Sequence, residues 1–298
     1  MYIMENMSTK SKWDQVISSK LKEGQSLADL KTTYDSSIVM EPNIVAEEVA
    51  GLQHTIADLK PWVNMATIKG TNAGELNSLA LLALNHGANG LNLIPEKPIL
   101  IKDALSGVLT EYLDVRIDCS TWALDDIIAE KKRLDHTAFP NVRWIGKGQV
   151  TEIQISATDR VTQYKAVLSE LTSDQTYDIV ITVSKNLLFE IASLRALRIV
   201  LNRLGITDYN LLVRYDVEGT NSLGDYDLIE KTYKVMSGIM GCADSVLTAY
   251  DGSEDARLSL NIHNVLELES GFKDVMDPVG GAYYVEKLVG EIIESVTS

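Results

Sequence analysis

The chain has 298 residues, of which 45% are hydrophobic, and this is enough apolar material for a large core. Its 27 basic and 42 acidic residues give a formal net charge of −15, which argues against nucleic acid and anionic membranes as partners. Cys119 and Cys242 cannot form a disulfide framework and have no second Cys or His at metal-ligand spacing beside them. There is no signal peptide and no apolar run of membrane-spanning length, so the sequence predicts a soluble, cytoplasmic protein.

Residues 1–60 read as an N-terminal helical and extended arm. An apolar stripe that starts at Trp13 predicts a short helix ending near Gly24, and turn-rich pieces follow it. The remainder, 61–298, is predicted to form one domain.

From Trp62 onward, β-rich runs alternate with helices, which is typical of parallel βαβ units. The predicted strands are 63–68, 89–94, 113–118, 152–157, 178–183, 210–215, 244–249 and a short eighth at 273–276. This rhythm predicts the α/β class and a (β/α)8 TIM barrel. A doubly wound open sheet is the alternative. The barrel is favoured because closure leaves no edge strand to protect.

The longest predicted helix, 186–205, carries leucines at spacings of three and four and stops at Gly205. This periodicity predicts an outer-ring helix packed on the barrel wall. Arg195 and Arg198 fall off the apolar stripe, so we expect them on a solvated face.

Barrel enzymes place reactive groups at the carboxyl ends of their strands, and those positions are polar here. The residues are Lys69, Glu96, Lys97, Asp118, Cys119, Thr158, Asp159, Ser184, Lys185, Asp216, Glu218, Tyr250, Asp251 and Asp277. Acids dominate this set and it contains no histidine, so helix caps and turns account for it better than catalysis.

The histidines and glycines also form no recognisable site. His54, His86, His136 and His263 do not combine with acids or cysteines in a metal-binding motif, and no glycine-rich stretch matches a phosphate loop. The residues alone therefore identify no catalytic, cofactor-binding or metal-binding residue.

Two segments, 250–286 and 186–201, resemble the barrel domain of the coenzyme-B12-dependent methylmalonyl-CoA mutase family. The shared residues are Asn261, Glu269, Ser270, Gly271, Asp277, Pro278, Gly280, Gly281, Tyr283, Tyr284, Val285 and Glu286. The arm resembles the N-terminal segment of the family's subunits more weakly. The segment "DPVGGAYYVE" (277–286) is thus a marker of the fold, leading from the eighth strand into the last helix.

The chain departs from the family where activity resides. After strand 152–157 the family carries a Tyr-His pair, and this chain has 156–159, Ser-Ala-Thr-Asp. After strand 244–249 the family has a G-H-T-Q-S-L-H-T-like stretch, which corresponds here to "GCADSVLT" (241–248). The loop after the first strand lacks the family's arginine and tyrosine. The resemblance therefore implies that three substrate-contacting places are changed.

Family members bind cobalamin with a separate domain whose D-x-H-x-x-G loop supplies a histidine to cobalt. No histidine of this chain lies in such a loop, so we expect this chain to bind no cofactor and a partner to carry adenosylcobalamin.

The resemblance supports three interpretations. The first is the small, non-catalytic subunit of a heterodimeric methylmalonyl-CoA mutase, an isomerase, with the arm clasping the catalytic large subunit. The second is the barrel subunit of an active acyl-CoA mutase that uses a separate B12-binding protein. The third is a stand-alone acyl-CoA-binding module. Whether the chain is itself an enzyme stays open, and the first interpretation is favoured because a barrel keeps its stability in packing and its function in loops.

Overall fold

The structure, a computed structural model, describes residues 10–35, 38–52, 56, 61–135, 137–215, 225–275 and 277–298. Within them, eight parallel strands form one sheet in the order β6-β5-β4-β3-β10-β9-β8-β7. The strands are β3 (Val63–Gly70), β4 (Gly90–Pro95), β5 (Asp114–Asp118), β6 (Val142–Ile145), β7 (Thr151–Ile155), β8 (Tyr177–Thr182), β9 (Tyr209–Arg214) and β10 (Ser245–Ala249).

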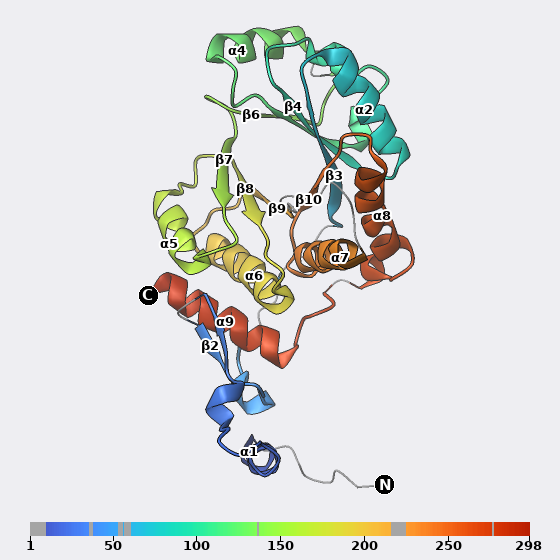
Figure 1. The fold of residues 1–298 in the computed structure, drawn as a ribbon. Coiled ribbons are helices and arrows are strands. Elements are labelled where there is room, and N and C mark those ends of the chain that lie inside the picture. Colours follow the sequence, from blue (N-terminus) through green and yellow to red (C-terminus); the bar gives the residue numbers. More distant parts are fainter. Residues whose placement is uncertain are drawn as a thin grey trace.

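Helices surround this sheet and alternate with its strands along the chain (Figure 1). They are α2 (Ala73–Asn85), α3 (Ile101–Ala104), α4 (Leu124–Arg133), α5 (Arg160–Glu170), α6 (Leu187–Arg203), α7 (Asp225–Met240), α8 (Glu254–Leu268) and α9 (Tyr283–Thr297). The prediction of an α/β, TIM-barrel-like fold is confirmed. In the described part of the chain, no helix has the length and apolarity needed to span a membrane.

One predicted strand is wrong and another was missed. The segment expected to form the eighth strand contains instead a 3-10 helix, Phe272–Asp274, within the connection from α8 to α9. The additional strand is β6, which is only four residues long and is followed by β7 without an intervening helix. A search for strand–helix pairs passes over such a strand because the second half of the pair is absent.

The barrel is nearly closed, with one interruption. β3 and β10 pair along five residues, from Val63 beside Ser245 to Thr67 beside Ala249. β6 and β7 share only an isolated bridge between Ile145 and Val150. Since Ile145 ends β6 and Val150 precedes β7, the two strands are offset along their length instead of lying side by side. We call this junction the seam.

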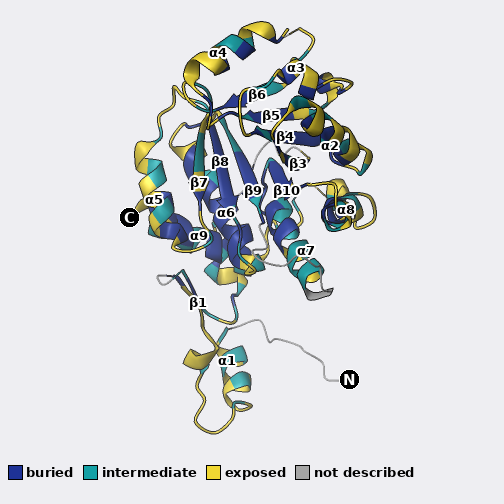
Figure 2. Ribbon diagram, turned by 45° about the horizontal axis from the view of Figure 1, so that its top comes forward, coloured by how far each residue is buried: buried dark blue, intermediate teal, exposed yellow. Residues whose placement is uncertain are grey.

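The core is divided between the two halves of the sheet (Figure 2). A larger apolar cluster joins β7, β8 and β9 to α5, α6 and α9, and a smaller one joins β3, β4 and β5 to α2, α3 and α4. A third, small cluster of Met65, Val180, Leu212 and Leu247 has the alternation expected of side chains facing the barrel interior.

Helix α6 is more buried than the sequence predicts. Arg195 is fully buried and pairs with Asp277, and Arg198 pairs with Asp244 at 2.8 Å with its side chain 15% exposed. The expectation of a solvated face is wrong because α9 packs on α6 (Figure 2), and because Arg198 contacts Asp244 and the Tyr209 ring near the amino ends of β10 and β9. A periodicity argument that assumes a single ring of helices cannot anticipate these contacts.

The N-terminal region has two parts that differ in packing. The hairpin of β1 (Thr32–Tyr34) and β2 (Ile38–Met40) lies against α9, and its Tyr34 stacks on Phe189 of α6 with ring centroids 5.5 Å apart. Helix α1 (Lys10–Ser18) buries no residue and lies at the far end from the barrel (Figure 1). Part of the predicted arm is thus packed on the barrel, and part of it projects.

Candidate functional site

The polar residues at the carboxyl ends of the strands do not converge on one site. Lys69, Glu96 and Lys97 are exposed, Asp118 is half-buried, and Cys119 is buried with its thiol pKa raised to about 12 by burial. Two members of the predicted set, 216 and 218, lie outside the described residues. Asp277 belongs to the connection before α9, where it accepts both hydrogen bonds of the Arg195 guanidinium at 3.0 and 2.9 Å.

The loop after β7 is closed upon itself. The Ser156 backbone N–H donates to Gln163 Oε1 at 2.8 Å, and Gln163 Nε2 donates to Ser156 Oγ at 2.6 Å. Ser156 Oγ in turn donates to the Thr158 carbonyl at 3.1 Å, and Asp159 has a left-handed backbone with φ 50°. The Ser156 groups and the Thr158 carbonyl are therefore engaged within the loop and with the start of α5, whereas the Asp159 side chain is exposed.

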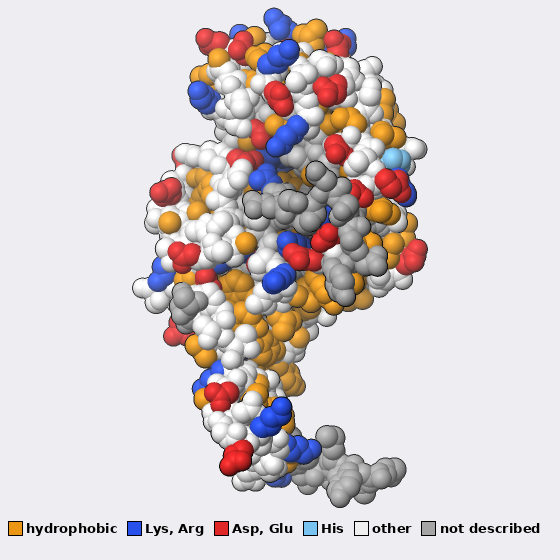
Figure 3. All heavy atoms as spheres, viewed as in Figure 1, with side chains coloured by type: hydrophobic (Ala, Val, Ile, Leu, Met, Phe, Trp, Pro, Cys, Tyr) orange, Lys and Arg blue, Asp and Glu red, His pale blue; other side chains and the backbone are white. Residues whose placement is uncertain are grey.

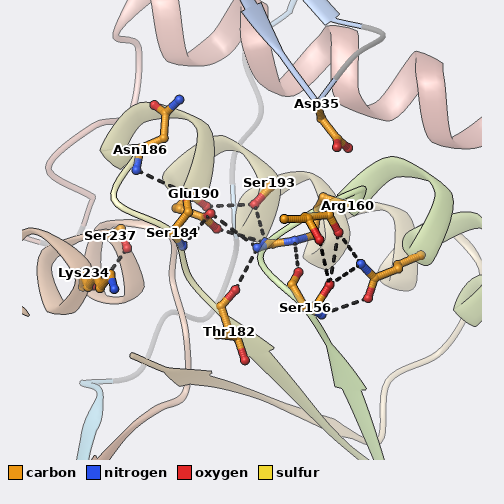
Figure 4. A network of polar contacts seen from close by, with 12 residues as sticks. Asp35, Ser156, Arg160, Thr182, Ser184, Asn186, Glu190, Ser193, Lys234 and Ser237 are labelled. Carbon is orange, nitrogen blue, oxygen red and sulfur yellow. Dashed lines mark hydrogen bonds and ion pairs between the residues drawn. The ribbon is translucent and has the colours of Figure 1, made fainter. Parts of the chain in front are cut away.

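A buried arginine, Arg160, also holds this loop in place (Figure 4). Arg160 Nε donates to the Ser156 carbonyl at 3.1 Å, and its Nη2 donates to the Thr182 carbonyl at 2.9 Å. Its Nη1 pairs with Glu190 Oε2 at 2.9 Å and reaches Ser193 Oγ at 3.2 Å. The neighbouring carboxylate helps to raise the pKa of Arg160 against the lowering effect of burial. Sequence reasoning missed this network because its members are far apart in the chain.

The loop after β8 is bonded to the same network. The Ser184 N–H donates to Glu190 Oε1 at 2.9 Å, so one carboxylate joins that loop to Arg160 (Figure 4). Every polar partner of Glu190 is thus supplied by the protein. This arrangement fixes two neighbouring loops, in which Asp159 and Lys185 are exposed.

The segment "GCADSVLT" lies at the opposite end of the barrel from the expected one. Cys242 and Asp244 precede β10, so they lie at the amino end of that strand. There Arg198 Nη2 donates to the Cys242 carbonyl at 2.7 Å and to Asp244 Oδ2 at 2.8 Å. The placement after strand 244–249 was wrong, because the motif was assigned to the strand's exit without fixing its register. The motif's last residues, Leu247 and Thr248, are inside β10.

The loop after β3 serves as a helix start. Asn72 caps α2 by accepting from the Glu75 N–H at 2.9 Å, and Glu75 accepts from the Thr71 N–H at 3.1 Å. These reciprocal bonds satisfy free backbone donors of the first helical turn. The acids at strand ends were interpreted as caps and turn formers, and Ser253, which caps α8 after Asp251, fits the same pattern.

A polar network around Arg116 fills the interior of the barrel together with the small cluster of Met65, Val180, Leu212 and Leu247. Arg116 of β5 donates through Nε to Asp178 Oδ2 at 2.8 Å and through Nη1 to Asn92 Oδ1 at 2.8 Å. Its Nη2 also pairs with Glu152 of β7. Since Arg116 and Asp178 are almost fully buried, these side chains occupy the space through which a ligand would have to pass along the barrel axis.

Several hollows open on the outside of the barrel or at the ends of its strands. One of about 320 Å³ lies beside the α8–α9 connection and is lined by Trp62, Ile239, Cys242, Phe272 and Pro278. Burial raises the pKa of the Cys242 thiol to about 11, so the group is not an activated nucleophile. A second hollow, of about 190 Å³, lies at the amino ends of the strands, and a third, of about 720 Å³, lies at the seam.

The histidines that the structure describes are already engaged. His263 is buried, accepts from Trp62 Nε1 at its Nδ1 at 3.3 Å, and lies 3.3 Å from Thr248 Oγ1 through its Nε2. His86 Nδ1 lies 2.7 Å from Tyr250 Oη. His54 and His136 lie outside the described residues. Within the described ranges no group of three or more His, Cys, Asp or Glu could hold a metal ion, and the two described imidazoles do not fit the role of a cobalt ligand.

The comparisons with known proteins point to one family. Residues 175–298 match the sequence profile of methylmalonyl-CoA mutase. Over 130 residues, the chain is 29% identical to a methylmalonyl-CoA mutase of Cereibacter sphaeroides, in a match covering 38% of this chain and 18% of that protein. A methylmalonyl-CoA mutase of Rhizobium meliloti is 28% identical with the same coverage.

A third similar protein is the 2-hydroxyisobutanoyl-CoA mutase large subunit of Aquincola tertiaricarbonis, 36% identical over 72 residues, which are 22% of this chain and 13% of that protein. The matched part of this chain spans less than a fifth of each of these relatives. The profile covers β8 to α9, the larger half of the core and the outer helix that packs on it. The chain is therefore related, through this part of its barrel, to the methylmalonyl-CoA mutase family.

Proposed function

We propose that the chain is the small, non-catalytic subunit of a heterodimeric, cytoplasmic acyl-CoA mutase. A catalytic large subunit would bring adenosylcobalamin and convert methylmalonyl-CoA to succinyl-CoA. The observation that carries this proposal is the closed loop after β7, where the resemblance places a Tyr-His pair and the chain has Ser156 to Asp159. Its hydroxyl groups bond within the loop and to Gln163, and its one exposed ionisable group, Asp159, supplies neither the phenol nor the imidazole of such a pair.

The barrel interior supports the same proposal. The Arg116 network and the side chains of Met65, Val180, Leu212 and Leu247 occupy the axis of the barrel. Displacing them would expose buried charges and apolar groups, which costs free energy that an acyl-CoA would have to supply on binding. The acidic balance of the chain adds repulsion toward the phosphates of coenzyme A.

The projecting N-terminal segment supports a role in binding a partner. Helix α1 buries no residue, although Trp13 and Ile17 are only half-exposed and Val16 is 38% exposed. Apolar side chains also gather between this segment and the barrel (Figure 3). A helix that carries partly exposed apolar residues and buries none of them in the described part of the chain is suited to an interface. One relative is named a large subunit, which is consistent with a division of labour between chains.

Co-expression with the long mutase polypeptide of the same genome tests this function. We expect a one-to-one complex by size-exclusion chromatography with light scattering, with mutase activity in the complex and none in this chain alone. Deleting residues 1–25 should weaken the complex. The matched control, Tyr112→Ser, changes a residue that is 78% exposed on the 3-10 helix Thr110–Tyr112 and should leave assembly unchanged. A chain that elutes as a lone monomer beside the large subunit contradicts the proposal.

The same material decides between the two alternatives. Succinyl-CoA formation by this chain with adenosylcobalamin and a separate B12-binding protein would favour an active barrel subunit. A thermal shift with coenzyme A esters would favour a binding module, since a ligand at about a hundred times its Kd stabilises by roughly 2.7 kcal/mol. We expect neither result, because the loop after β7 lacks the Tyr-His pair and the side chains of the Arg116 network occupy the barrel axis.

A further inference from the structure

The seam between β6 and β7 is the weakest point of the barrel's backbone. The other neighbouring strands are joined by continuous ladders of three or more residue pairs, whereas β6 and β7 share one bridge. No helix of the described chain follows β6, so the outer ring of helices is also interrupted between α4 and α5. Backbone hydrogen bonds and helix packing therefore contribute little to closure at this place.

A water-accessible groove lies at the same junction. It has a volume of about 720 Å³ and is lined by polar residues that include Lys147, Gln149, Glu152 and Thr176. The turn that joins the two strands passes close to the loop after β5, because a Cβ at Gly146 (φ 141°) would lie 3.0 Å from the Cys119 carbonyl oxygen. The seam thus has a solvated outer side and a tight turn. Neither feature explains what holds β6 and β7 together.

The interior of the barrel supplies charged contacts between the two sides of the seam. Arg116, from the β3–β6 half, pairs with Glu152 and Asp178, which belong to the β7–β10 half. Arg143, the middle of β6, donates to Asp178 Oδ1 at 3.1 Å. The side chains of Arg116 and Asp178 are 2% and 0% exposed, so losing one partner would leave a largely desolvated charge.

Asp178 is the centre of this arrangement. Its Oδ2 accepts from Arg116, and its Oδ1 accepts from Arg143 and from Asn210 Nδ2 at 2.9 Å. The carboxylate of β8 is thereby bonded to β5 and β6 across the seam and to its own neighbour β9. If the two halves separated, the hydrogen bonds from Arg116 and Arg143 to Asp178 would break together.

We propose that Arg116, Arg143, Glu152 and Asp178 form an ionic clasp that holds the seam shut in place of a strand ladder. The β3–β10 junction, with its continuous ladder, is the hinge of this device. When the clasp breaks, the barrel opens between β6 and β7 into two four-stranded halves that stay joined at β3 and β10. The seam is therefore the site of the barrel's first opening, before global unfolding.

Native-state hydrogen exchange of the full chain tests the clasp. In the unmodified protein, amides of β6 and β7 should exchange through an opening with a small denaturant dependence, while those of β3 and β10 exchange only on global unfolding. In Arg116→Met or Asp178→Asn, exchange at β6 and β7 should accelerate on the order of a hundredfold or more, because a broken buried pair leaves an uncompensated charge. Arg143→Met, at a half-exposed arginine, should give a smaller acceleration at the same amides and is expected to fold.

The matched control is Arg198→Met. It breaks another largely buried ion pair, to Asp244, but one whose elements already lie on the same side of the seam. The control should accelerate exchange without concentrating the effect at β6 and β7. The clasp is refuted if the unmodified protein shows equal protection at both junctions, or if the clasp variants accelerate all strands to the same degree as Arg198→Met.

Discussion

The two halves of the barrel meet at two junctions that are built in different ways. At one junction, β3 and β10 share a ladder of five residue pairs and a network of neutral groups around His263. At the other, β6 and β7 share a single bridge and the ionic clasp. The comparison shows that one sheet can close by backbone hydrogen bonds at one place and by buried side-chain charges at another.

The chemistry of each junction follows from its surroundings. At the β3–β10 junction, α8 covers the outside, and Trp62, Asn64 and Thr248 bond to neutral partners in a dry layer. At the seam the outer helix is absent and a groove of about 720 Å³ admits water. Charged groups that face inward can bridge an interrupted ladder there without needing a covering helix. The junctions should therefore fail under different perturbations.

The largest expected effect comes from a third network, which lies inside one half and at neither junction. Arg160→Met leaves the buried carboxylate of Glu190 without its cation, and the loss should be about 3–5 kcal/mol of unfolding free energy. Urea unfolding measures this loss. The exchange pattern should change at the loops after β7 and β8 and should not single out the seam.

A double variant separates lost pairing from lost packing. Arg160→Met with Glu190→Gln removes the buried charge together with its partner, so it should recover part of the stability lost in the single variant. If the double variant is no more stable than Arg160→Met alone, the arginine acts through shape and its carbonyl bonds to Ser156 and Thr182. A loss that appears mainly at β6 and β7 would remove the distinction between this network and the clasp.

Acid should destabilise the β3–β10 junction through the buried imidazole of His263. Burial lowers the pKa of His263 from 6.5 to about 3. Trp62 donates to Nδ1, so the proton of the neutral ring lies on Nε2 and points to Thr248. Between pH 6.5 and 3 the unfolded chain takes up a proton that the folded chain refuses. The contribution of neutral His263 to the free energy of unfolding is therefore complete above pH 6.5 and declines as the pH falls toward 3.

Urea unfolding as a function of pH measures this effect. His263→Gln removes the titrating ring, so it should flatten the dependence between pH 6.5 and 4 and cost about 1–3 kcal/mol at neutral pH through a poorer bond to Trp62. His86→Gln is the control, because His86 is half-buried and bonds to Tyr250, away from the Trp62–His263–Thr248 network. An unchanged pH dependence in His263→Gln would show that other groups dominate the acid response.

The strand pattern of this fold is readable from sequence because β-rich runs alternate with amphipathic helices. Seven of the predicted strands correspond to β3, β4, β5, β7, β8, β9 and β10. The eighth was placed at 273–276 because the count of strand–helix pairs required one more member. The missing member, β6, is four residues long and has no helix after it, so it lacks the periodic signal on which such predictions depend.

The site was harder to predict for a different physical reason. The loop 156–159 could be recognised as unlike the family's motif from its residue types alone. Its closure by Gln163 and Arg160, and the clasp of Arg116 with Asp178, depend on which side chains face the same space, and that is set by register and packing. Asp178 begins a predicted strand and reads as an ordinary strand boundary until the barrel closes around it.

The smallest effect is expected where the N-terminal hairpin fastens onto the β7–β10 half. Asp35 Oδ2 accepts from the Val161 N–H at 2.6 Å, which satisfies a free donor in the first turn of α5. Asp35→Ala should cost about 1 kcal/mol in urea unfolding, since it removes a capping bond of this kind.

Asp35→Gly tests the backbone separately, because φ is 45° at this position and glycine adopts it without strain. If alanine destabilises more than glycine, the difference measures the strain. The described contacts of the hairpin are with α5, α6 and α9, so neither change should alter exchange at β6. A faster exchange there would mean that the hairpin also supports closure of the seam, and that closure does not depend on the clasp alone.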